Sequence, residues 1–152
     1  MILGIDPGSE VSGFAVLDGD RLRESGIVPN MTLLELVKVW DGELAIEMIA
    51  SYGMAVGKDI FDTCVFIGRL QQAYEKPHEC KMLFRRDIKK HICDNGQAKD
   101  ANIRRALMDM WPATGGGKVP VIGTKDNPGP LYGVTEHMWA ALAVAVTARD
   151  LG

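Results

Sequence analysis

Two acidic residues occupy places in the chain where a carboxylate is costly to bury. Asp6 closes the apolar run Met-Ile-Leu-Gly-Ile-Asp, and Glu47 interrupts the apolar segment Glu43–Ile49. A buried carboxylate needs a cation to pair with it, and Mg²⁺ prefers oxygen ligands and keeps water and substrate phosphates in its shell. Two metal ions about 4 Å apart would activate water and stabilise the departing oxygen of a phosphodiester. Either acid alone is equally compatible with a structural hydrogen bond or a surface position.

A basic segment offers a surface for phosphates. Between Lys81 and Arg105 there are eight basic residues against three acidic ones, although the formal net charge of the chain is −3. The overall charge argues mildly against a nonspecific polyanion binder, but a local excess of bases can face phosphates while the remaining surface stays acidic. The alternative is an ordinary solvated helix face. The residues that we predict to contact nucleic acid are Arg85, Arg86, Lys89, Lys90 and Lys99.

The elements that would position these residues follow from apolar periodicity and turn residues. The run that ends at Asp6 predicts a buried strand before the turn Pro7-Gly8, and Asp18-Gly19-Asp20 predicts a hairpin between the next two strands. Further strands are predicted over 43–49 and 80–84, and helices over 33–40, 58–74, 86–92, 100–111 and 138–146, with Thr32 and Thr135 as caps and an irregular loop over 112–132. Three antiparallel strands followed by alternating strands and helices indicate an α/β fold, a mixed sheet with helices on both faces.

Composition predicts one ordinary domain. The chain has 152 residues, of which 47% are hydrophobic, enough for a core without disulfides, and its three cysteines form no CxxC pair. The longest apolar run, Met138–Val146, is far shorter than the roughly 20 residues of a membrane-spanning helix, and no signal-like segment opens the chain. We therefore expect a cytoplasmic protein with no membrane partner.

Several ordered segments resemble RuvC-type Holliday junction resolvases. Gly4-Ile5-Asp6-Pro7-Gly8-Ser9 and Ser12-Gly13-Phe14-Ala15-Val16 resemble the opening of that family, and Leu44-Ala45-Ile46-Glu47 resembles its second motif. The segments 58–73, 86–89, 96–99 and 141–147 are similar to its central helix, its arginine-x-apolar-lysine segment, the turn after it and the last helix. An opening of this kind alone is shared with sugar kinases and other actin-like ATPases, whereas the ordered set covers nearly the whole chain.

The resemblance implies a single nuclease domain over residues 1–152 with an RNase H-like fold and a five-stranded mixed sheet. It also implies a homodimer, dependence on Mg²⁺ with Mn²⁺ as a substitute, and symmetric nicking of branched DNA such as four-way junctions. By position, Asp6 matches the first catalytic acid and Glu47 the second. Lys89 matches a lysine near the scissile phosphate, where a positive charge stabilises the transition state, and Arg86 accompanies it.

The last helix departs from the family pattern of two metal ligands three residues apart. Those positions hold His137 and Ala140, and alanine binds no metal, whereas histidine can coordinate one or deprotonate water. Three explanations remain open: another acid, such as Glu136, Asp100 or Asp126, substitutes; the site works with three ligands; or the chain is an inactive variant. Asp100 also stands where many relatives carry lysine. We predict a metal site of Asp6, Glu47 and His137, with Glu136 as an extra ligand.

Two further hypotheses follow from the same residues. An RNA-directed nuclease of the same fold, such as an rRNA-processing enzyme, differs in substrate, and Ala140 motivates a catalytically impaired protein that binds junctions without cutting them. The short connection 29–41 and the loop 123–133, which has no assignable counterpart, suggest a phage or prophage branch of the family.

Overall fold

The first three strands form an antiparallel meander. In the computed structural model, which describes residues 1–152, β1 (Ile2–Asp6) pairs with β2 (Val11–Asp18), and β2 pairs with β3 (Arg21–Pro29). The hairpin between β2 and β3 turns at Gly19, whose φ of 59° is tolerated best by glycine. The predicted meander is confirmed, with strand ends that differ by one residue.

Two parallel strands complete the sheet on the other side of β1. β4 (Glu43–Met48) pairs with β1, and β5 (Lys81–Phe84) pairs with β4, which gives the order β3-β2-β1-β4-β5. Ile5 lies opposite Ile46 in this register. Because parallel strands end at the same edge of a sheet, Asp6 and Glu47 lie next to each other at the carboxyl ends of β1 and β4.

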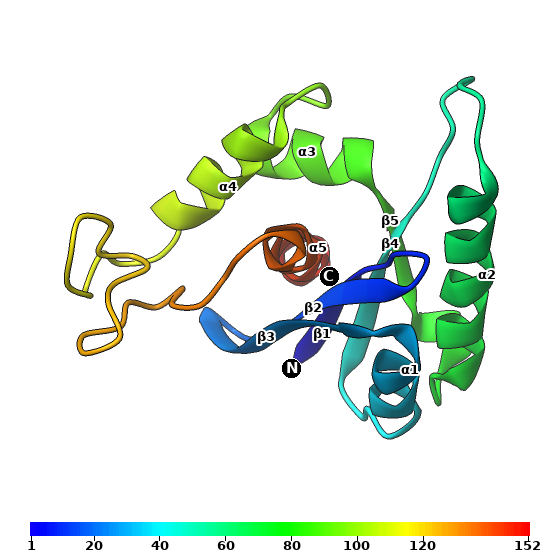
Figure 1. The fold of residues 1–152 in the computed structure, drawn as a ribbon, viewed down its shortest axis with the longest axis horizontal. Coiled ribbons are helices and arrows are strands. Elements are labelled where there is room, and N and C mark those ends of the chain that lie inside the picture. The colour runs from blue at the N-terminus through cyan, green and yellow to red at the C-terminus, as the bar shows by residue number, and fades with distance from the viewer.

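Helices cover both faces of the sheet, as predicted (Figure 1). On one face lie α1 (Asn30–Lys38) and α2 (Lys58–Ala73). On the other face α5 (His137–Leu151) packs against the strands, and α3 (Arg85–Cys93) and α4 (Asp100–Asp109) lie beyond it. A short 3₁₀ helix, Pro77–Glu79, precedes β5. Each face has its own apolar core. The first residues of α3 and α5, Arg85 and His137, contact Glu47 and Asp6 at the carboxyl edge of the central strands.

Two glycines in the strands allow α5 to approach the sheet closely. A Cβ on Gly4 would lie 2.5 Å from the carbonyl oxygen of Ala141, and one on Gly13 would lie 2.6 Å from that of His137. Neither distance is compatible with a side chain. The small residues therefore seat the start of α5 directly beside the end of β1, where Asp6 lies.

The two helix caps predicted from threonine are wrong. Pro29 rather than Thr32 precedes α1, and Glu136 rather than Thr135 precedes α5, with no side-chain cap in either case. Glu136 adopts a positive φ of 48°, so the chain enters α5 through a sharp bend that threonine capping does not describe. The segment 112–132 is irregular, as predicted, and anchors itself through Val121 and Leu131, which are buried. None of the helices is long and apolar enough to cross a membrane.

Candidate functional site

A buried pair of carboxylates forms the centre of the candidate site. Asp6 at the end of β1 and Glu47 in β4 are each only 8% exposed, and they are the only acidic residues among the buried ones. Nδ1 of His137 lies 3.0 Å from Oδ2 of Asp6. The structure thus brings together three of the residues that the sequence analysis singled out, from three separate elements.

Burial and mutual repulsion disfavour the ionised form of Asp6. Burial and, after it, the negative charge of Glu47 raise the pKa of Asp6 from 3.8 to about 6, while Arg85 and His137 act in the opposite direction. Two carboxylates in this position favour a bound cation, because a cation stabilises both charged forms at once.

Arg85, the first residue of α3, supplies one cation from the protein itself. Its Nε donates to Oε1 of Glu47 at 2.7 Å, and its Nη1 lies 3.3 Å from Oδ1 of Asp100. Burial acts to lower the pKa of Arg85, but the hydrogen bond and charge of Glu47, together with the charges of Asp100 and Asp6, outweigh burial and raise it. The guanidinium therefore stays charged beside Glu47.

The oxygen and nitrogen atoms at this site are suitable ligands for a divalent metal ion. Asp6 and Glu47 offer carboxylate oxygens, and the Nε2 atom of His137 remains available while Nδ1 contacts Asp6. No three His, Cys, Asp or Glu side chains are gathered in metal-binding geometry, since Glu47 is turned to Arg85 and His137 to Asp6. The ligand types of Asp6, Glu47 and His137 therefore suit a divalent ion, although the three side chains are not gathered around one point.

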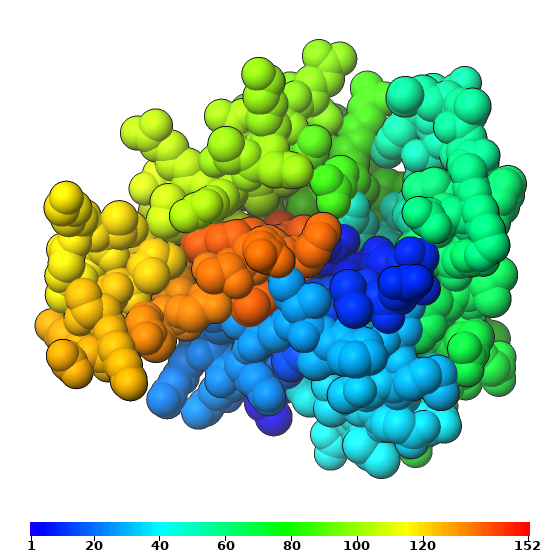
Figure 2. Space-filling model, viewed as in Figure 1, coloured from blue at the N-terminus to red at the C-terminus, as the bar shows by residue number.

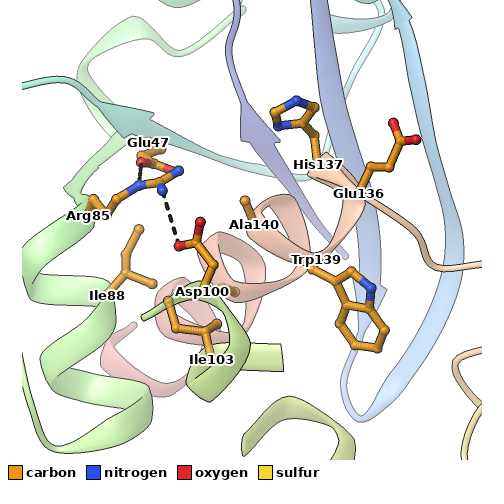
Figure 3. A pocket seen from close by; sticks show the side chains of 10 residues that line it. Glu47, Arg85, Ile88, Asp100, Ile103, Glu136, His137, Trp139 and Ala140 are labelled. Carbon is orange, nitrogen blue, oxygen red and sulfur yellow. Dashed lines mark hydrogen bonds and ion pairs between the residues drawn. The ribbon is translucent and has the colours of Figure 1, made fainter. Parts of the chain in front are cut away.

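Of the other candidate ligands, Glu136 and Asp100 line a cavity together with Glu47, whereas Asp126 does not. Glu136 is exposed at the entry to α5, and its carboxylate points away from Glu47 and Arg85 (Figure 3). Asp126 is exposed in the irregular segment and is not among the residues that line the cavities at Asp6 and Glu47. Asp100 is close to the site but is directed at Arg85. None of these acids supplies the metal ligand that Ala140 lacks.

Two cavities meet at the site. One, of about 410 Å³, is lined by Glu47, Arg85, Asp100 and Ala140 together with apolar side chains of α3, α4 and α5 (Figure 3). The other, of about 490 Å³, opens over Asp6 and the turn that follows it. Glu47, Arg85 and His137 line both cavities. The start of α5 reaches the surface between the N-terminal strands and α3–α4 (Figure 2), so the site is accessible to a large substrate.

The predicted phosphate contacts are spread along α3 and the turn after it. Arg86, Lys90 and Lys99 are exposed, and Lys89 is half-buried. Lys89 lines neither of the two cavities at the carboxylates, whereas Arg85 lines both. Sequence reasoning assigned Arg85 to nucleic-acid binding and missed its pairing with Glu47. The available signal was its place directly after β5, which runs parallel to β4.

The fold has relatives among solved structures, although sequence comparison finds none. A scan of protein-family models and a search of curated proteins gave no match. The structure of Thermus thermophilus RuvC matches with a TM-score of 0.65 and 18% identity over 98% of this chain and 95% of that chain. The structure of T. thermophilus RuvC in complex with a Holliday junction substrate matches with a TM-score of 0.64 and 17% identity over 96% and 90%.

These likenesses define the class of fold. The mixed five-stranded sheet and its helices form a RuvC-type, RNase H-like fold, as the sequence predicts. Both matches cover at least nine tenths of each chain. No finding supports an origin in a phage or prophage.

Proposed function

We propose that this protein is a metal-dependent endonuclease that cuts branched DNA, such as four-way junctions, by phosphodiester hydrolysis. The observation that carries the proposal is the buried pair of Asp6 and Glu47 at the carboxyl edge of the two central strands, open to an accessible cavity. The RuvC-type fold and the junction bound in one of the similar structures support this choice of substrate.

The chain's own residues prepare the reaction in three ways. Asp6, Glu47 and His137 would hold Mg²⁺ or Mn²⁺, which supplies Lewis-acid activation of water and of the phosphate when bound. The contact between Asp6 and Nδ1 of His137 orients the imidazole. Arg85 keeps a positive charge at the cavity wall, where it attracts the phosphate and stabilises developing negative charge. Lys89 and Arg86 on α3 extend this positive surface.

Cleavage of defined substrates tests the proposal. The purified protein is incubated with a labelled four-way junction, a linear duplex of the same sequence and an RNA–DNA hybrid, each in Mg²⁺, Mn²⁺ and EDTA. We expect cleavage of the junction alone, in the presence of either metal, at paired positions in opposite strands. Preferential cutting of the hybrid would favour the RNA-directed alternative.

Ala140 supports a second candidate, a protein that binds junctions without cutting them. The side chain that borders the cavity at this position offers no ligand, so fewer donors are present than a site with four ligands would have. Tight and selective junction binding, with no cleavage in either metal, would establish this second function and exclude the first.

A further inference from the structure

The site has too few buried acids for two metal ions. Two divalent ions bring four positive charges, whereas Asp6 and Glu47 are the only buried acids of the chain. Position 140 is alanine, and Glu136 points away from Glu47 (Figure 3). Asp100 and Glu136 also line one of the cavities, but Arg85 cancels one charge, so the four acids leave three negative charges, fewer than the four positive charges of two divalent ions.

Arg85 adds a fixed positive charge where a second ion would need ligands. It lines the same cavity as Ala140 and contacts Glu47 at 2.7 Å. A cation in the first turn of a helix is unfavourable for the helix itself, because the amino end of a helix carries partial positive charge. Arg85 begins α3, so its position is explained by Glu47 and Asp100 and not by the stability of α3.

The guanidinium retains donors for a substrate. Arginine has five N–H donors, of which one on Nε and one on Nη1 are engaged with Glu47 and Asp100, which leaves three. The side chain is 43% exposed, in contrast to 11% for the side chain of Glu47. Both N–H groups of Nη2 make no contact within the protein and can donate to the oxygens of a phosphate.

We propose that the Arg85 guanidinium replaces a second metal ion at this site, so that the protein uses one divalent cation and one built-in cation. Asp100 and Glu47 hold the guanidinium in place, and its free N–H groups contact the phosphate that is cut. This inference rests on the proposed function for its substrate, whereas the number of metal ions does not depend on it.

Counting ions by isothermal titration calorimetry tests the proposal without DNA. Mn²⁺ is titrated into the wild-type protein and into the double variant Arg85→Gln with Ala140→Asp, which removes the guanidinium and adds a carboxylate. We expect one Mn²⁺ per chain for the wild type and two for the double variant. Two ions in the wild type, or one ion in the folded double variant, would overturn the proposal.

Single substitutions then test the role of the charge in cleavage. Arg85→Gln keeps a hydrogen-bonding side chain without the charge and should cut the junction about 100-fold more slowly, as expected for the loss of one preorganised donor. Arg85→Lys should lie between Arg85→Gln and the wild type because it restores a cation without the planar geometry. Arg21→Ala, on the exposed side of β3, is the control and should cut normally.

The outcomes separate this inference from the proposed function. If the wild type cuts no branched DNA in any metal, the proposed function fails, and the ion count still decides whether Arg85 replaces a metal. If the wild type cuts junctions and Arg85→Gln cuts them equally fast, the function stands and the inference is overturned. Circular dichroism melts of every variant confirm that each comparison is made between folded proteins.

Discussion

At the scale of single residues, the cost of burying Asp6 beside Glu47 is the clearest sign of function. The structure retains two nearby acids in a place where apolar residues would stabilise the fold, and it offsets only part of their repulsion with Arg85 and His137. The buried pair lowers the stability of the fold, which is the cost we expect if the site binds a cation, as proposed. The stability and the activity of the protein should therefore respond in opposite directions when Asp6 is neutralised.

Asp6→Asn should abolish cleavage and leave junction binding intact or stronger, because one negative charge facing the phosphate is removed. Cleavage assays and gel-shift titrations with the same junction measure both effects. Asp41→Asn, at an exposed position before β4, is a matched control. If the Asp6→Asn protein still cuts the junction, Asp6 is not a catalytic residue.

The same variant should be more stable than the wild type in EDTA above about pH 6. The folded-state pKa of Asp6 is about 6 against 3.8 ordinarily, so the folded state binds the proton more tightly than the unfolded state does. Ionised Asp6 therefore lowers the free energy of unfolding of the wild type. This cost is absent below pH 3.8, grows between pH 3.8 and about 6, and above that reaches its full size of about 3 kcal/mol. Urea unfolding of both proteins from pH 4 to 8 checks this, and a stability difference that stays constant with pH would contradict it.

His137→Ala should lose at least about 100-fold in cleavage while keeping its fold, since the ring is largely exposed and contributes little packing. His78→Ala, in the exposed 3₁₀ helix, is the control. The assay is cleavage of the four-way junction in Mg²⁺ and in Mn²⁺. If His137→Ala cuts normally and Glu136→Gln is inactive, Glu136 and not His137 is the third metal ligand.

At the scale of elements, the strands were predictable because each has a plain local signal. The apolar run before Pro7 and the single acid within 43–49 place both carboxylates at strand positions, and parallel pairing then brings them to one edge. The caps of α1 and α5 were not predictable from threonine. Their geometry depends on tertiary contacts: Asn30 donates to the carbonyl of Gly8, and α5 is seated by close contact with Gly13.

The candidate site was predictable in part for the same reason. Residue type and family resemblance predicted that Asp6, Glu47 and His137 share one site. The pairing of Arg85 with Glu47 and Asp100 was not predictable, because it depends on how α3 leaves β5 and how α4 packs beside α3. A run of two arginines does not reveal which one turns inward. Only the three-dimensional register of β4 and β5 separates Arg85 from the exposed Arg86.

The helix α3 should carry part of the salt-dependent binding to DNA. Replacing Lys89 and Lys90 with alanine should weaken junction binding and reduce the slope of log K against log salt by about one for each phosphate that is no longer neutralised. Fluorescence anisotropy from low to moderate salt measures the slope. Replacing Lys118 and Lys125 in the irregular segment is the comparison, and an unchanged slope in the Lys89/Lys90 variant would place the DNA on another surface.

At the scale of the whole molecule, cutting a four-way junction symmetrically requires two sites, and this chain provides one carboxylate pair. A second copy would supply the other. The outer face of α2, which forms one edge of the molecule (Figure 1), is suited to this contact. Phe61 and Val65 are 60% and 67% exposed there, and a Cβ on Gly68 would meet no atom within 4 Å. These residues follow helical spacing and therefore share one face.

We predict a homodimer formed through this face of α2. Phe61→Glu with Val65→Glu should give a folded monomer, because two charges would then have to be buried in an apolar contact, and sedimentation velocity measures the change in mass. The monomer should keep its carboxylate site and its affinity for Mn²⁺, yet lose the paired nicks in opposite strands of a junction. Lys76→Glu with Glu75→Lys, beyond the end of α2, keeps the net charge and should remain dimeric. If the Phe61/Val65 variant still sediments as a dimer, the interface lies on another surface; if the wild type is a monomer that nicks both strands in pairs, two independent binding events replace the dimer as the source of symmetry.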